Sequence, residues 1–232
     1  MSLLSLIQTV TALLSLPVPA TVVGSSDRQV LQMLALANEE GQTLASAHNW
    51  QILNEEFRFT TTATQSQATA IPSDLARWLP NSFFNRTTRR PITGPITPRQ
   101  WQWIQAQPVY STVYLAFRER TGTFLFAPTP PAGQSIYGEY ISKNWCQSIG
   151  LVGQSTWQAD TDTALLDETL MALGLRWRFL KAKGLEYGED FATYERQVEQ
   201  ARGNDGGSTM LSLAPQPVDL NRVNLPDGSF GV

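Results

Sequence analysis

Residues that could carry out chemistry are few in this 232-residue chain, which contains one cysteine, Cys146, and one histidine, His48. Zinc sites and cysteine–histidine pairs need several such side chains together, so both are almost excluded. Asp160 and Asp162 could bind a metal ion, but carboxylates before an apolar helical pattern are typical of a helix N-cap. We therefore expect a capping role for them, a helix-end role for His48, and a half-buried strand position for Cys146.

The sequence also lacks a phosphate-binding loop and a glycine-rich dinucleotide fingerprint. Together with the missing catalytic clusters, this predicts a protein that is not an enzyme, with no catalytic residue, no metal site and no cofactor.

A short basic loop carries Arg86, Arg89 and Arg90, and aromatic residues precede and follow it along the chain. These aromatic residues are Phe83, Phe84, Trp101 and Trp103. Basic and aromatic side chains together are typical of surfaces that bind nucleic acid. Alternatives are a solvated loop with the aromatics packed beneath it, or a loop that meets an acidic neighbour. The net charge of −3 argues against a general nucleic-acid coat, so the three arginines are candidates for local DNA or subunit contact.

The last residues, 203–232, begin with a glycine-rich stretch and continue as an extended tail. Prolines and polar residues separate its apolar side chains, so such a tail cannot bury them on itself. We expect another subunit to bury them, which favours an assembly component over a free enzyme. The predicted contact residues are Leu211, Leu213, Val218, Leu220, Val223, Leu225 and Phe230.

The elements that position these residues are predicted from hydrophobic spacing. The apolar N-terminal stretch from Ser2 to Leu16 is typical of one face of a docking helix, and no basic residue precedes Arg28 as a signal peptide would require. It is too short to span a bilayer. A second helix follows from about residue 25 to 47, and two further helices follow Asp162, the last ending near 201.

Between the helices, alternating apolar and polar residues predict an antiparallel β meander, with a short helix at Pro98 and another over residues 75–79. The fold class is therefore α+β, with a helical bundle from both chain ends and an inserted antiparallel β domain. The expected boundaries are 1–52 for N-terminal helices, 53–158 for the β domain, 159–202 for C-terminal helices and 203–232 for the tail.

Several segments in this order resemble the head-to-tail adaptor, or connector, proteins of tailed bacteriophages, including the tail tubular protein A group. The segments span roughly residues 25–200. They are Trp50 leading into the strand to Thr62, Ile71–Asp74, the hairpin Val109–Pro128, Tyr137–Cys146 and Leu165–Glu195. The apolar N-terminal helix departs from this resemblance, and its partner is not predicted.

The resemblance implies a structural virion protein in the neck of the particle, assembled in the host cytoplasm with no membrane contact. It implies a ring of twelve copies that joins the portal to the tail nozzle or tail tube. The C-terminal segment would bind the portal, and genomic DNA would be retained in and pass through the channel. The alternative from the residues alone is a secreted or surface carbohydrate-binding β protein with helical flanks.

Overall fold

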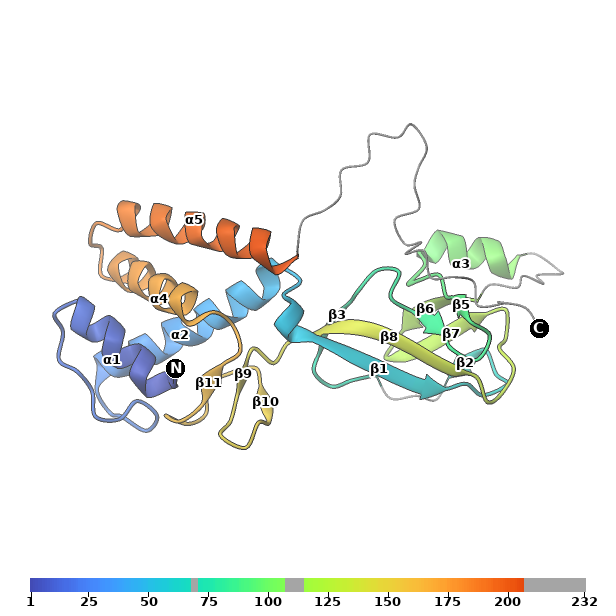
Figure 1. Cartoon of the computed structure of the whole chain (residues 1–232), viewed down its shortest axis with the longest axis horizontal. Helices are drawn as coiled ribbons and strands as arrows, with labels where there is room; N and C mark the ends of the chain where they lie inside the picture. The colour runs from blue at the N-terminus through green and yellow to red at the C-terminus, as the bar shows by residue number, and fades with distance from the viewer. Residues whose placement is uncertain (68–70, 107–114, 207–232) are drawn as a thin grey trace, which may run out of the picture.

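The computed structural model of the chain describes residues 1–67, 71–106 and 115–206. Two regions lie end to end along the long axis of the molecule (Figure 1). We call residues 1–50 and 143–206 the helical lobe, and residues 51–142 the β lobe. This architecture confirms the predicted α+β fold, in which helices from both ends of the chain pack together beside an inserted antiparallel β region. The predicted tail contacts lie outside the described residues.

The helical lobe consists of helices from both chain ends and a small three-stranded sheet with the order β10-β9-β11. Its elements are α1 (Leu3–Leu13), α2 (Arg28–Ala47), β9 (Cys146–Gln147), β10 (Gly153–Gln154), β11 (Thr163–Ala164), α4 (Glu168–Ala182) and α5 (Gly188–Asp205). Helix α4 contacts α1, α2 and α5, so it is the central helix of the bundle.

The N-terminal helix α1 is part of this bundle, which identifies the partner that the sequence left open. Ser2 caps it, and Leu3, Ile7 and Val10 are fully buried. The backbone N–H of Leu3 also donates to the carbonyl oxygen of Asp162, at 2.8 Å. The predicted docking helix therefore docks on its own chain.

The predicted helix cap at Asp160 and Asp162 is wrong. Helix α4 begins later, and Asp167 caps it by accepting hydrogen bonds from the backbone N–H groups of the first turn. Asp162 is buried and accepts from two backbone N–H groups in the preceding turn, both at 2.8 Å. Asp160 accepts from the backbone N–H of Val22 and Val23. Both carboxylates therefore satisfy loop backbone, because β11 intervenes before the helix.

The end of α4 is as predicted, and the last helix is longer than predicted. Lys183 forms the C-cap, and Gly184 follows with a φ of +69°, a conformation that favours glycine. Helix α5 continues to Asp205, past the predicted end near residue 201.

The described part of the β lobe contains two sheets, one α-helix and one 3-10 helix. Its elements are the 3-10 helix η1 (Gln51–Leu53), β1 (Asn54–Thr60), β2 (Ser66–Gln67), β3 (Leu75–Trp78), β4 (Phe84–Asn85), β5 (Arg90–Pro91), α3 (Pro98–Gln105), β6 (Ala116–Arg120), β7 (Thr123–Ala127) and β8 (Ser135–Ser142). Helix α3 begins as predicted, with Pro98 in its first turn and a capping box between Thr97 and Gln100.

Strand pairing differs in part from the predicted meander. The hairpin is confirmed over β6 and β7, with Gly122 at a φ of +72° in its turn, and its predicted first residues, 109–114, lie outside the described residues. Strand β8, however, leaves β7 and pairs with β1, β3 and β4 in the larger sheet. The helix predicted over 75–79 is also wrong, because this segment is β3. It pairs with β8 from Leu75 to Trp78, so its backbone hydrogen bonds go to the sheet.

The core of the β lobe is aromatic and lies between the two sheets. Phe124 on β7 is fully buried, and the centre of its ring lies within 6.4 Å of the centres of six other aromatic rings. These partners are Phe57, Phe59, Trp78, Phe83, Phe117 and Phe126. The two sheets thus pack as a small sandwich, which agrees with the apolar faces seen in the sequence.

Candidate functional site

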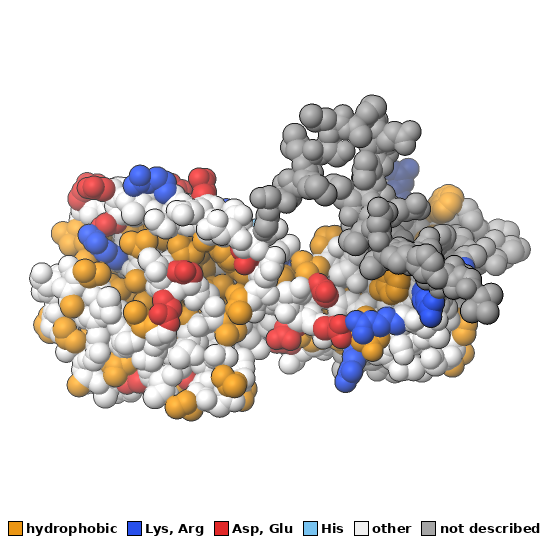
Figure 2. All heavy atoms as spheres, in the orientation of Figure 1, with side chains coloured by type: hydrophobic (Ala, Val, Ile, Leu, Met, Phe, Trp, Pro, Cys, Tyr) orange, Lys and Arg blue, Asp and Glu red, His pale blue; other side chains and the backbone are white. Residues whose placement is uncertain are grey.

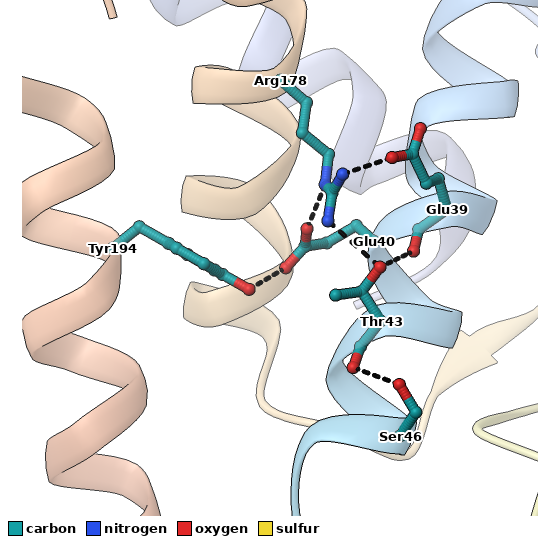
Figure 3. A network of polar contacts seen from close by, with 6 residues as sticks. All are labelled: Glu39, Glu40, Thr43, Ser46, Arg178 and Tyr194. Carbon is teal, nitrogen blue, oxygen red and sulfur yellow. Dashed lines mark hydrogen bonds and ion pairs between the residues drawn. The ribbon is translucent and has the colours of Figure 1, made fainter. Parts of the chain in front are cut away.

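A buried polar network connects three helices of the helical lobe (Figure 3). The carboxylate of Glu40 on α2 accepts hydrogen bonds from Arg178 Nε on α4, at 2.5 Å, and from the Tyr194 hydroxyl on α5, at 2.6 Å. Arg178 also donates to Glu39 and Thr43 on α2. Glu40 is 0% exposed and the Arg178 side chain is 10% exposed, so this pair lies within the core, while Glu39 lies at the surface.

Burial dominates the electrostatics of this network. It raises the pKa of Glu40 above its ordinary value, and the hydrogen bonds from Tyr194 and Arg178 oppose part of that rise. Burial, with the nearby Glu40 carboxylate, also raises the pKa of the Tyr194 hydroxyl. The buried carboxylate of Glu40 is paired with both Arg178 and Tyr194, so the network holds α2, α4 and α5 together.

The network fixes α5, whose last residues contact the segment after α2. Near the end of α5, Asp205 accepts a hydrogen bond from the backbone N–H of Gln51 at 3.0 Å and lies 3.6 Å from His48 Nε2. On the β lobe side, Arg77 donates to the His48 carbonyl oxygen and to Asn49 Oδ1, at 2.5 and 2.6 Å. These contacts tie α5, the end of α2 and strand β3 together at the junction.

The arginine loop lies in the β lobe, and its residues have different surroundings. Arg86 forms an ion pair with Glu56 at 2.8 Å, and its guanidinium lies 3.2 Å from the centre of the Tyr137 ring. Arg89 is exposed and has a φ of +55°, and Arg90 is an exposed residue of β5. Figure 2 shows basic and acidic side chains next to each other on the β lobe. Contact of these arginines with DNA or a subunit stays a prediction.

The aromatic residues near this loop divide into two groups. Phe83 and Trp101 are buried in the β lobe, so their rings serve packing. Phe84 and Trp103 are 40% and 63% exposed, which leaves their faces accessible to another molecule.

The single cysteine is a packing residue. Cys146 is fully buried in β9 rather than half-buried as expected, and burial raises the pKa of its thiol to about 12. It is therefore not a nucleophile near neutral pH. In the described part of the chain, no group of three or more histidine, cysteine or carboxylate side chains could hold a metal ion. None of the described helices has the length and apolar character to cross a membrane.

Sequence reasoning missed the Glu40 network. Arg178 and Tyr194 lie 138 and 154 residues from Glu40 along the chain, so no local spacing connects them with it. One signal was present, because Glu40 lies between Ala37 and Leu44 on the apolar stripe of α2. A carboxylate on such a stripe is rarely buried without a partner.

Comparison with known proteins gives a family. The chain matches the family described as SU10 adaptor protein over residues 1–217. The match includes α1, which the resemblance to head-to-tail adaptors had left unexplained, and it continues past the end of α5. No curated protein matches the chain. The chain therefore belongs to the SU10 adaptor protein family, a family of structural bacteriophage adaptors, which implies that it is not an enzyme.

Proposed function

We propose that this protein is the head-to-tail adaptor of a tailed bacteriophage, with the role of the tail tubular protein A group. Twelve copies form a ring in the neck of the virion, between the portal and the tail nozzle or tail tube. The C-terminal tail binds the portal, the β lobe faces the tail, and genomic DNA is retained in and passes through the channel. Assembly takes place in the host cytoplasm.

The observation that carries this proposal is the extent of the family match. It begins at the first residue and ends at residue 217, so it includes Leu211 and Leu213 of the predicted portal-binding tail. A family of phage adaptors that shares this segment supports a role for it in adaptor assembly.

The two-lobe architecture supports the same proposal. The lobes lie end to end (Figure 1), so one molecule can contact a partner at each end. The junction contacts of Arg77 and Asp205 set the relative position of the lobes. Such a molecule suits a protein that connects two different assemblies.

The position of α1 argues against the secreted carbohydrate-binding alternative. Removal of α1 as a signal peptide would expose the core, because Leu3, Ile7 and Val10 are completely buried. The backbone of α1 is also tied to the rest of the lobe, because the N–H groups of Leu3 and Leu4 donate to the carbonyl oxygens of Asp162 and Asp160. The N-terminal segment thus belongs to the folded protein.

The test is binding of the full chain and of a chain lacking residues 208–232 to the purified portal. We expect the shortened chain to keep its circular dichroism spectrum and to lose portal binding in co-sedimentation. Two double variants give a finer test. One carries both Leu211→Ser and Leu213→Ser, and its matched control carries both Ser212→Ala and Gln216→Ala. The leucine pair should weaken binding at least about a hundredfold, since each buried leucine contributes about 1.5–3 kcal/mol.

Unchanged portal binding by the shortened chain would refute the proposed role of the tail. Electron microscopy of the adaptor–portal complex counts the copies, and twelve are expected.

A further inference from the structure

The hairpin between β9 and β10 presents apolar side chains to solvent where a turn is usually polar. Ile149, Leu151 and Val152 are 83%, 77% and 64% exposed. We call these three residues the apolar tip. No charged residue occurs between Cys146 and Ala159, so no charged side chain in this segment compensates for the exposed apolar groups. Figure 2 shows hydrophobic side chains at the lower edge of the helical lobe, where Figure 1 places this hairpin.

The tip is held in a defined conformation. The backbone N–H of Ser148 donates to the Val152 carbonyl oxygen at 3.0 Å, and the Leu151 N–H donates to the Ser148 carbonyl oxygen at 2.9 Å. Its base is anchored in the helical core by Trp145 and Cys146, which are 1% and 0% exposed. Because the turn is already ordered, its three side chains can bind a partner with little loss of conformational freedom.

A complementary groove of about 420 Å³ lies at the junction end of the same lobe. Buried apolar residues of α2, α4 and the segment after α2 form its floor, and Ile52, 59% exposed, lies at its edge. The apolar residues that line it are Leu44, Trp50, Ile52, Leu166, Leu170 and Ala201.

The two carboxylates that line this groove are already paired within the chain. Asp167 accepts from the N–H groups of Thr169 and Leu170, at 2.7 and 3.1 Å. Asp205 accepts from the N–H of Gln51 and lies 3.6 Å from His48 Nε2. The groove therefore does not require a basic ligand. Uncharged polar side chains line the rest of it, namely Thr169, Gln197, Gln200 and Asn204, and these can hydrogen-bond to the backbone of an inserted turn. An uncharged turn with apolar side chains, such as the tip, matches this combination of apolar and uncharged polar surface.

We propose that the apolar tip of one copy inserts into this groove of the next copy. The tip cannot fill its own groove, because the hairpin projects from the lower edge of the helical lobe and α5, which lines the groove, lies along the upper edge (Figure 1). A contact between two different surfaces of the same protein is heterologous, and repeated heterologous contacts give a ring where the rotation between copies closes and an open filament where it does not. This inference rests on the proposed ring and names the surfaces that form it.

Disulfide trapping tests the contact in the full-length chain bound to the portal. The variant Ile149→Cys with Ile52→Cys should give a ladder of disulfide-linked copies on a non-reducing gel. Neither single variant should give a ladder. The matched control is Leu185→Cys with Ile52→Cys, which should also give none, because Leu185 is exposed but lies outside the tip. The native Cys146 does not interfere, since it is buried with a pKa of about 12.

A charge at the tip tests the energetic role of the contact. Ile149→Asp should lower the ring population at least about tenfold in native mass spectrometry, whereas Leu185→Asp should leave it unchanged. Both side chains are mostly exposed, so the monomer should keep its melting temperature in either variant.

Two results would overturn the inference: portal-bound rings that form without the Ile149–Ile52 ladder, or groove occupation by another segment. The second is measured by alkylation of Ile52→Cys in the isolated chain, where protection that disappears on removal of residues 208–232 would show that the tail fills the groove. Portal binding by the unmodified chain tests the proposed function separately, so each proposal can fail alone.

Discussion

Both lobes of this protein bury an apolar cluster, and they differ in the contacts that accompany it. In the helical lobe, a buried carboxylate, a guanidinium and a hydroxyl connect α2, α4 and α5, and each group has one favourable arrangement. In the β lobe, stacked and tilted aromatic rings fill the space between two sheets. Hydrogen-bonded charges are directional and costly to leave unpaired, whereas apolar contacts are non-directional. The helical lobe should therefore tolerate less change in its core than the β lobe.

The largest expected effect comes from Glu40→Ala in the helical lobe. Arg178, with a side chain 10% exposed, would lose its buried partner, and the free energy of unfolding should fall by about 3–5 kcal/mol. Urea unfolding followed by circular dichroism measures this change. The adjacent Glu39→Ala is the matched control, because Glu39 is 59% exposed and should contribute no more than about 1 kcal/mol. Equal losses for the two variants would contradict a special role for the buried carboxylate.

A smaller effect is expected from Phe124→Leu in the β lobe. The substitution keeps an apolar side chain but removes the ring contacts, so we expect a loss of about 2 kcal/mol. Faster hydrogen exchange in β1 and β8, with α2 and α4 unaffected, would place the effect in the aromatic core. Trp103→Leu serves as the control, since this side chain is 63% exposed and should change stability by no more than about 0.5 kcal/mol. If Phe124→Leu lowered the free energy of unfolding more than Glu40→Ala does, the expected difference between the two lobes would be contradicted.

The smallest expected effect is a dependence of stability on pH that belongs to the helical lobe. Because burial raises the pKa of Glu40 in the folded state above 4.5, the folded protein holds the proton more strongly than the unfolded chain. This contribution is complete below the unfolded pKa and is lost as pH rises through the folded pKa. Unfolding at a series of pH values should show this decline in the unmodified protein. In Glu40→Gln, which has no proton to lose at this position, the same slope should be absent.

Local patterns gave reliable expectations where a single element decides the outcome. The helix end at Lys183 and Gly184, the capped start of α3 at Thr97 and the β6–β7 hairpin all depend on residues within a few positions. In each case, the residue type sets a backbone angle or supplies a nearby hydrogen bond. Such features require no knowledge of the rest of the fold.

Expectations failed where a distant segment competed for the same residues. Asp160 was expected to cap a helix, but it accepts hydrogen bonds from Val22 and Val23, far away in the sequence. The segment Leu75–Trp78 was expected to be helical, but β8 offered it a strand partner. Local sequence favoured both interpretations, and long-range backbone pairing decided against them.

The amino-acid sequence by itself determined the mixed α+β class and the resemblance to phage adaptors. Only the tertiary structure decided that α1 completes the bundle, that β1 pairs with β8, and that Glu40 meets Arg178 and Tyr194. The physical reason is that residue spacing shows which face of an element is apolar, not which face elsewhere covers it. The entropic cost of closing the loop between two segments rises slowly with loop length, so it favours a near partner over a distant one only weakly.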